Sequence, residues 1–311
     1  MLLTQEQEMI RDAMREFARE RLAPFAAEWD RKATFPKEAL AELAGLGAFG
    51  MAVPERWGGA GMDYVSLALA LEEIAAGDGA TSTIISVNNS VVCGPILAFG
   101  TDAQKERFLK PLASGAQLGC FCLTEPHVGS DAAAIRTSAV RDGNEWVLNG
   151  VKQFITSGKH AQVAIVFAVT DKTAGKKGIS AFIVPTDAPG YVVARVEEKM
   201  GQHASDTAQI LLENCRVPAA ESAGRGRRRL PHRPGQPGGR PHRHRRPVGR
   251  HGARGLRGGA EVRPGARGLR QAHHRTSGGE LPPRRHGHAH RGGAPAGAAR
   301  RASCATPASP A

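Results

Sequence analysis

FCLTEPHVGSDAAAIRT, residues 121–137, lies between a part of the chain with helical periodicity and a part with strand periodicity. It joins an apolar run to a loop that carries the hydroxyls of Thr124 and Ser130 and a glycine, Gly129. Such a loop can present backbone N–H groups, and a glycine lets a flat or anionic ligand approach the main chain closely. The same residues also fit a second interpretation, in which Thr124 and Asp131 only cap turns. The stretch is neither a Walker loop nor a Gly-x-Gly-x-x-Gly fingerprint, so it does not support nucleotide binding of those types.

The residues before this stretch carry the signals of a helical domain, residues 1–113. Thr4 and Gln7 have the spacing of a capping box, and apolar residues then recur at helical spacing until Pro24, where we expect the first helix to end. Thr101-x-x-Gln104 has the same capping spacing. The other predicted helices cover residues 36–46, 64–76, 81–99 and 101–112, and a loop at residues 54–62 separates the first two of them.

The residues after the stretch change to short alternating runs, which are typical of strands. Two turn pairs, Asp142-Gly143 and Asn149-Gly150, are expected to connect hairpins. We therefore predict an α+β fold, in which an all-α domain over residues 1–113 is followed by an antiparallel β domain over residues 114–221. The further strands are expected within residues 161–170, 178–186, 191–200 and 208–218.

Composition separates a third part of the chain, residues 222–311. The first 221 residues carry 21 Lys plus Arg against 27 Asp plus Glu, and all 15 aromatic residues, which is enough for one or two domains with a core. Residues 222–311 carry 21 Arg, no Lys, no aromatic residue, and only Glu261 and Glu280 as acids. Burial of so few apolar side chains cannot offset the entropy that is lost when the chain becomes ordered. We therefore predict that residues 222–311 form a disordered tail.

Several classes of protein are not indicated. The first ten residues are too short and too acidic for a signal peptide, and we expect no apolar run to reach the ~18 residues of a membrane helix. The five cysteines lack paired metal-ligand spacing, and an odd count without a secretory signal fits a reducing compartment. We expect a cytoplasmic protein without a membrane span, a disulfide or a metal site.

FCLTEPHVGSDAAAIRT resembles the loop of flavin-dependent acyl-CoA dehydrogenases, in which a Thr-Glu-Pro turn is followed by Gly-Ser-Asp. The resemblance continues, in the family's order, through PERWGGAGMDYVSLALALEEIA, FGTDAQKERFLKPLASG, NGVKQFITSGKHA and KMGQHASDTAQILLENCRVP, and so covers nearly all of residues 1–220. The chain departs from the family at His127-Val128, where many members have Gly-Ala, and at Phe154, where members often have Trp.

The resemblance implies an FAD cofactor and assigns it residues in two stretches. Thr156 would hydrogen-bond near the flavin nitrogen that receives hydride. Gly129 and Ser130 would contact the pyrophosphate, with Ser130 also near the thioester arm of the substrate. The flavin would be lined by Phe121, Cys122, Leu123 and Thr124, covered by Phe154, and contacted by Ile155. Without the family context, a lone Phe154 would be interpreted as a core aromatic in a strand.

The family resemblance also implies the reaction and the partners. An acyl-CoA substrate of short or medium chain would lose hydrogen from its α and β carbons, and electron-transfer flavoprotein would accept the electrons. Intact members form homotetramers through a C-terminal helical bundle, and in the members most like this chain that bundle also carries the catalytic Glu. No candidate for this base is visible: Glu125 belongs to the loop motif, and Glu261 and Glu280 lie in Arg- and Gly-rich sequence. We therefore expect no catalytic residue and no dehydrogenase activity in this chain.

Two interpretations of the tail remain open. Reading one nucleotide later, the codons for residues 261–290 can give RYAQERVAFGKPIIEHQAVNFRLADMATR, which has helical periodicity and resembles the missing bundle. A frameshift near residues 219–222 would explain this. In the alternative, the tail is a basic arm that binds nucleic acid non-specifically through phosphates, and the protein is a non-catalytic dehydrogenase remnant. The arm lacks the aromatic residues that commonly stack on bases.

Overall fold

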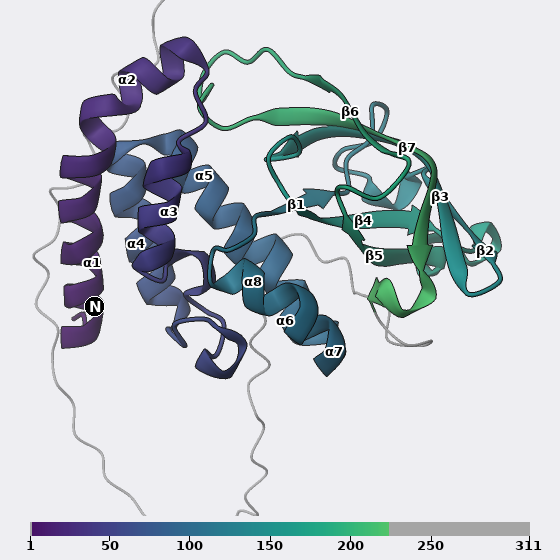
Figure 1. The fold of residues 1–311 in the computed structure, drawn as a ribbon, viewed down its shortest axis with the longest axis horizontal. Coiled ribbons are helices and arrows are strands. Elements are labelled where there is room, and N and C mark those ends of the chain that lie inside the picture. Colours follow the sequence, from purple (N-terminus) through teal and green to yellow (C-terminus); the bar gives the residue numbers. More distant parts are fainter. Residues whose placement is uncertain (1, 224–311) are drawn as a thin grey trace, which may run out of the picture. The chain divides into compact units, whose positions relative to one another are not determined.

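The computed structural model describes residues 2–223, in which helices make up the first part and strands the second (Figure 1). The α+β fold predicted from the sequence is confirmed. The helices are α1 (Gln5–Phe17), α2 (Ala23–Lys32), α3 (Lys37–Gly45), α4 (Tyr64–Gly77), α5 (Gly79–Val87), α6 (Gly94–Phe99), α7 (Asp102–Gln104) and α8 (Lys110–Ala113). The strands are β1 (Gly119–Cys122), β2 (Ser138–Asp142), β3 (Glu145–Thr156), β4 (Val163–Val169), β5 (Ile179–Pro185), β6 (Tyr191–Val196), β7 (Thr207–Pro218) and β8 (Ser222–Ala223).

The described part of the chain ends just beyond the point where the composition changes. Ser222 and Ala223, which composition assigned to the tail, still pair with β5. The predictions of disorder, of an out-of-frame origin and of nucleic-acid binding concern residues 224–311, which lie outside the described residues.

Helix α1 begins at the predicted capping box. Thr4 Oγ1 accepts from Gln7 N at 3.2 Å, and Gln7 Oε1 accepts from Thr4 N at 3.1 Å. The expectation that Pro24 ends the helical run is wrong. The chain passes through a π-helical turn, Ala18–Leu22, into α2, and Pro24 lies in the first turn of α2. Proline is tolerated there because the N–H groups of a first helical turn have no partner within the helix.

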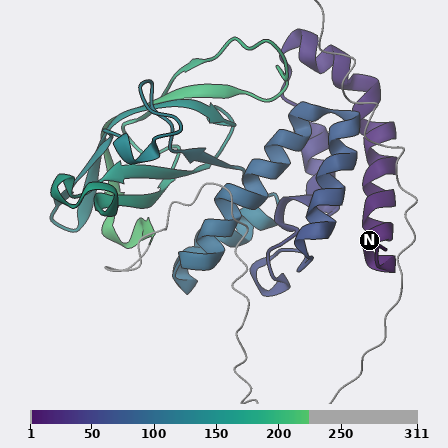
Figure 2. The same cartoon turned by 180° about the vertical axis from the view of Figure 1, so that it is seen from behind.

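Helices α5 and α6 are joined by a π-helical turn into one helix, Gly79–Phe99, shown from behind in Figure 2. By length and composition alone this helix is long and apolar enough to cross a membrane. The prediction that no apolar run reaches the length of a membrane helix is therefore wrong. Two asparagines interrupt its apolar residues, and both are buried. Asn88 Nδ2 donates to Phe49 O at 2.9 Å, and Asn89 Nδ2 donates to Ala48 O at 2.7 Å. These bonds fix the helix to a neighbouring loop of the helical domain.

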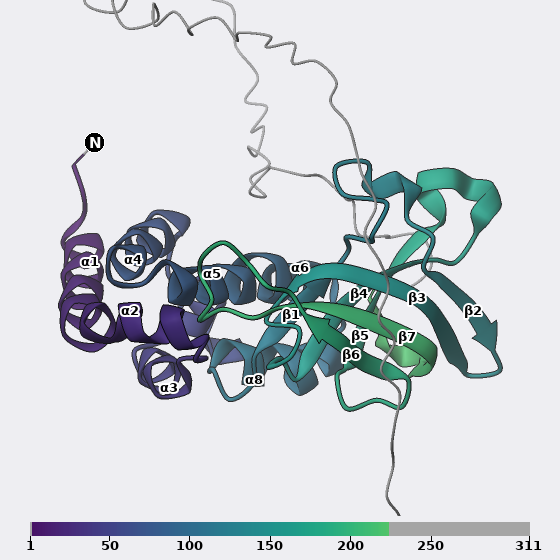
Figure 3. The same cartoon turned by 90° about the horizontal axis from the view of Figure 1, so that it is seen from above.

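The described strands form one eight-stranded sheet that curls (Figure 3). Its order is β6-β7-β3-β2-β4-β5-β8, with β1 paired to β4. Most neighbours are antiparallel, as expected, but β1 runs parallel to β4, and β2 meets β4 in one parallel pair. The long loop between β1 and β2 returns the chain to the end of the sheet at which β1 began. Strand β2 therefore runs in the same direction as β1, and β4 is parallel to both.

One of the two predicted turns is correct and the other is wrong. Asp142-Gly143 begins the connection between β2 and β3. Asn149-Gly150 does not form a turn but lies inside β3, where the register against β7 shifts. Asn149 Oδ1 accepts from Asn214 N at 2.8 Å, and Gly150 has a φ of +152°. A β-bulge thus uses the same residue types as a tight turn.

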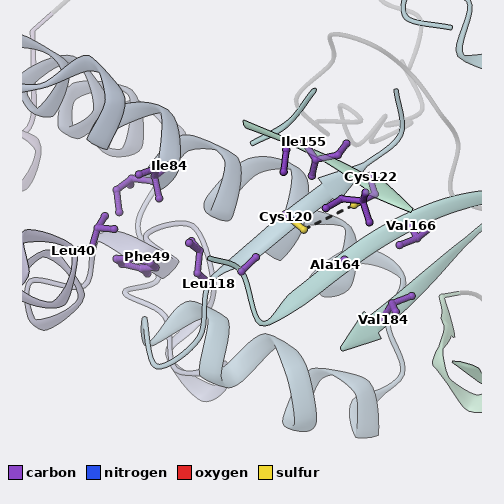
Figure 4. Packing of buried hydrophobic residues seen from close by; sticks show 14 of the residues in the cluster. Leu40, Phe49, Ile84, Leu118, Cys120, Cys122, Ile155, Ala164, Val166 and Val184 are labelled. Carbon is purple, nitrogen blue, oxygen red and sulfur yellow. Dashed lines mark hydrogen bonds between the residues drawn. The ribbon is translucent and has the colours of Figure 1, made fainter. Parts of the chain in front are cut away.

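The apolar core runs from the helices into the sheet without a break. One cluster includes Leu40, Phe49 and Ile84 of the helical part together with Cys120 and Val166 of β1 and β4 (Figure 4). The start of β1 is also fixed by a polar contact, because Gly119 N donates to the buried Asn88 Oδ1 at 3.0 Å. The strand that leads into the 121–137 stretch is therefore held by the helical domain.

Replacing Gly150 by Ala tests the packing at the bulge in β3. A Cβ at this position would lie 2.5 Å from Thr137 Oγ1 and 2.7 Å from Thr137 Cα, so we expect Gly150→Ala to lower the free energy of unfolding by about 2 kcal/mol. Gly45→Ala is the control, because a Cβ there meets no atom within 4 Å, and it should be neutral or slightly stabilising. Urea unfolding measures the free energy of unfolding of both variants. Equal changes in the two variants would contradict the close packing of Gly150 against Thr137.

Candidate functional site

Two stretches about thirty residues apart in the sequence meet at one place. The loop that follows β1 lies against the end of β3, because Gln153 N donates to Thr124 O at 2.8 Å. The loop is closed on itself by a pair of backbone bonds, Glu125 N to Val128 O at 2.9 Å and Val128 N to Glu125 O at 3.0 Å. The structure thus brings the predicted residues of the first stretch beside those of the second.

A buried ion pair connects the same two stretches. Lys152 Nζ lies 2.9 Å from Glu125 Oε1 and donates to Leu123 O at 3.1 Å, and the side chains of Lys152 and Glu125 are 0% and 2% exposed. The carboxylate also accepts from Arg136 N at 2.7 Å and from Thr137 N at 2.9 Å. All of its partners therefore belong to the loop or to β3.

The surroundings shift the pKa of both partners. Burial alone would raise the pKa of Glu125, but the charge of Lys152 and the hydrogen bonds from Thr137 and Arg136 outweigh it and hold that pKa below its ordinary value. Burial lowers the pKa of Lys152, and the Glu125 carboxylate partly opposes this. A carboxylate so enclosed and so fully bonded cannot take a proton from a bound substrate, so Glu125 is not a candidate general base.

Phe154 points away from the protein at a strained position. Its side chain is 62% exposed and its φ is +57°, which is unusual for a bulky residue. The register of β3 against β7 shifts between Lys152 and Ile155, and this bulge directs the ring outward while Ile155 stays buried. Such strain is typical of functional sites, whereas a core aromatic would be buried. The interpretation of Phe154 as a core residue is therefore excluded.

Two threonines lie on the same two chain segments, the loop and the end of β3 that carries Gln153 and Phe154. Thr156 ends β3 and is half-buried, as is Thr124 in the loop. No residue among 2–223 hydrogen-bonds either hydroxyl. The next residue, Ser157, also has a positive φ, of +60°, and its N–H donates to Asp206 O at 2.9 Å. The two threonine hydroxyls are therefore available to a ligand, at the chain segments that the Gln153 bond holds together.

The loop beyond Glu125 is open. Gly129 and Ser130 are exposed, and a Cβ built on Gly129 would meet no atom within 4 Å. The space beside the Gly129 main chain is therefore free for a ligand, although no protein contact requires glycine at this position.

The other predicted site residues divide into two groups. Phe121 and Leu123 are half-buried, and the Phe121 ring packs edge-on against Phe167 with centroids 5.1 Å apart. Cys122 and Ile155 are buried in the core, so they can offer a ligand only their main chain. Figure 4 shows Cys122 beside Cys120, with 3.9 Å between the sulfur atoms. Within residues 2–223 no group of three or more His, Cys, Asp or Glu side chains could hold a metal ion.

Lys152 and Gln153 are the residues of this site that the sequence analysis missed. The available signal was a lysine among the residues of a predicted strand, within NGVKQFITSGKHA, and the structure shows that this lysine is buried. A buried lysine needs a partner, but the sequence does not identify Glu125 as that partner, because 26 residues separate the two.

A helical domain is thus followed by a curled sheet, with an exposed aromatic ring and two unbonded hydroxyls where a loop meets a strand end, an arrangement suited to binding a ligand. The model of the acyl-CoA dehydrogenase N-terminal domain matches residues 4–116, and that of the acyl-CoA dehydrogenase middle domain matches residues 120–215. Through these two domains the chain belongs to the acyl-CoA dehydrogenase family, whose members are FAD-dependent oxidoreductases.

Individual relatives agree with this assignment. The human mitochondrial short-chain specific acyl-CoA dehydrogenase is 45% identical over 216 residues, which are 70% of this chain and 52% of the human protein. The structure of butyryl-CoA dehydrogenase from Megasphaera elsdenii is 40% identical with a TM-score of 0.70, covering 72% of this chain and 60% of that one. A glutaryl-CoA dehydrogenase from Mycobacterium smegmatis in complex with FADH2 is 40% identical with a TM-score of 0.67, covering 71% and 56%. The chain spans about half the length of the curated relatives it matches.

The strain at Phe154 can be measured without any ligand. At a φ of +57° glycine is favoured over alanine, so Phe154→Gly should be more stable than Phe154→Ala by about 1 kcal/mol. Val140, 63% exposed in β2, has no such φ and serves as the control, and there the glycine variant should be the less stable of the pair. Urea unfolding of the four variants measures their free energies of unfolding, and the difference between the glycine and alanine variants should have opposite signs at the two positions. If glycine and alanine rank in the same order at both positions, Phe154 is not strained.

Proposed function

We propose that residues 2–223 hold one side of the active site of an FAD-dependent acyl-CoA dehydrogenase, which removes hydrogen from the α and β carbons of a short- or medium-chain acyl-CoA thioester. The observation that carries the proposal is the outward-facing, strained Phe154 beside two hydroxyls that lack protein partners. An exposed ring offers a surface for a flat heterocycle, and the hydroxyls suit its polar edge.

The residues present fit FAD. Phe154 would lie on one face of the flavin ring, and Phe121, Leu123 and the main chain of Cys122 and Ile155 would line it. The open main chain at Gly129 and the exposed hydroxyl of Ser130 would meet the pyrophosphate, where backbone N–H groups suit an anion. FAD, when bound, supplies the hydride acceptor that no side chain provides.

The chain's own groups would then orient the reactants. Thr156 would donate its hydroxyl hydrogen to the flavin edge, and Ser130 would lie near the thioester arm of the substrate. The relatives named for short-chain and butyryl substrates support an acyl chain at the short end of the range.

The base is proposed to be absent from this chain. Glu125 is enclosed and ion-paired, and the family's Glu belongs to a domain with which residues 224–311 share no sequence pattern as written. We propose that a one-nucleotide shift near codon 220 separates the written sequence from that domain. The shift is supported by the helical, family-like peptide that the other reading frame yields.

Three further proposals concern partners. A reduced flavin must pass on two electrons, and electron-transfer flavoprotein is proposed as the acceptor by resemblance to the family. The tetramer of intact members is proposed only for the restored reading, because the family forms it through the C-terminal bundle. For residues 222–311 as written, 21 arginines favour non-specific phosphate binding, which would weaken steeply with salt.

The function is tested by comparing the 311-residue chain with a version in which the reading frame is restored near codon 220. The restored protein should be yellow, and butyryl-CoA added without oxygen should bleach its flavin. The chain as written, given FAD and the same substrate, should not bleach it, because loss of a base alone typically slows such chemistry by ~10²- to 10⁴-fold. Rapid bleaching by the chain as written would contradict the missing base, and a restored protein without flavin would contradict the proposed function.

Thr156 is tested in the restored protein. Thr156→Ala should slow single-turnover flavin reduction roughly fivefold, which corresponds to the loss of one hydrogen bond of ~1 kcal/mol. Thr170→Ala is the control, because Thr170 is also half-buried and its hydroxyl donates to Gly178 O at 2.9 Å, within the connection between β4 and β5. It should change stability but not the reduction rate. Equal reduction rates in all three proteins would remove Thr156 from the site.

A further inference from the structure

The buried pair of Glu125 and Lys152 is bonded to two separate segments of the chain, one at each end of the loop. The Glu125 oxygens accept from Arg136 N and Thr137 N, where the loop returns to the sheet, and from Lys152 Nζ, near the end of β3. Lys152 Nζ also donates to Leu123 O, where the loop leaves β1. One carboxylate and one ammonium group therefore fix the beginning, the middle and the end of the loop to the same strand.

These contacts lie directly beside the groups that would face a ligand. Lys152 holds Leu123, and the next residue, Gln153, holds Thr124 through its backbone N–H. The residue after Gln153 is Phe154, the exposed aromatic. Two consecutive residues of β3 thus set the position of the loop relative to the ring.

A purely stabilising role would not need this arrangement. Both side chains are withdrawn from water, and a buried ion pair is often no more stabilising than a well-packed apolar pair. What an apolar pair cannot do is accept two backbone N–H groups and donate to a carbonyl at fixed positions. The bonds, rather than the burial, determine the shape of the loop.

We propose that Glu125 and Lys152 are positioning residues that hold the main chain of residues 123–130 in its ligand-ready form against β3. Through them the Thr124 hydroxyl and the Phe154 ring form one surface before any ligand arrives. The inference rests on the proposed FAD site, and it deepens that site by assigning its preorganisation to a pair of residues that do not touch the ligand.

The test uses the full 311-residue chain and four variants. Glu125→Gln keeps the shape of the side chain but loses its charge and half of its acceptors, and Lys152→Met removes the donor. The double variant Glu125→Gln/Lys152→Met leaves no unpaired buried charge. Glu145→Gln, the control, breaks an exposed ion pair with Arg216 at 2.8 Å on the same strand.

Amide hydrogen exchange is read for the peptide of residues 121–137 and for the peptide of β4, and FAD affinity is read by fluorescence titration. Exchange in residues 121–137 should rise at least tenfold in both single variants and in the double variant, with β4 unchanged, and the control should match the parent chain. The double variant should recover much of the thermal stability that the single variants lose, yet keep the fast loop exchange. Where the parent binds FAD, the three site variants should bind it at least tenfold more weakly.

The outcomes separate this inference from the proposed function. Parent-like loop exchange in the double variant would overturn the positioning role, since charge balance alone would then suffice, and so would loss of stability in the single variants without faster loop exchange. A protein with the restored reading frame that shows no FAD binding would count against the proposed cofactor site, while the exchange data would still decide whether Glu125 and Lys152 position the loop.

Discussion

The contact between Lys152 and Glu125 is the constraint on which the rest of the site depends. A fully buried ammonium group must find oxygen partners, and here it finds a carboxylate and a carbonyl that belong to one loop. The carboxylate in turn must be saturated, and it draws in the two backbone N–H groups at the far end of that loop. The loop shape is thus a consequence of satisfying two buried charges.

The helical domain supplies the second constraint, at the other end of β1. The buried Asn88 donates to Phe49 O and accepts from Gly119 N, so one amide joins the long helix, a loop of the helical domain and the first residue of β1. The apolar cluster crosses the same boundary. Both ends of the segment from Gly119 to Thr137 are therefore fixed by buried polar side chains.

The geometry also separates what the described residues can do from what they cannot. They offer a ring, free hydroxyls and open main chain, which are groups that bind and orient. The carboxylate among them, Glu125, is occupied by its own structural bonds and has its pKa held below the ordinary value. The groups at this loop and strand end are therefore suited to binding a ligand, and the Glu125 carboxylate among them is not free for acid–base chemistry.

Local signals in the sequence determined the capping box at Thr4, most of the helices, the Asp142-Gly143 hairpin and the strand runs, because each depends on residues within a few positions of one another. Where such signals failed, the structure differs in two ways: a π-helical turn carries the chain past Pro24, and Asn149-Gly150 forms a bulge against β7, where Gly150 packs closely on Thr137. The family blocks predicted Phe154 as a site residue, but only the folded sheet shows that a bulge directs its ring outward. The pairing of Lys152 with Glu125 could likewise not be predicted from the sequence, because it forms only when a loop and a strand that are distant in the chain lie side by side.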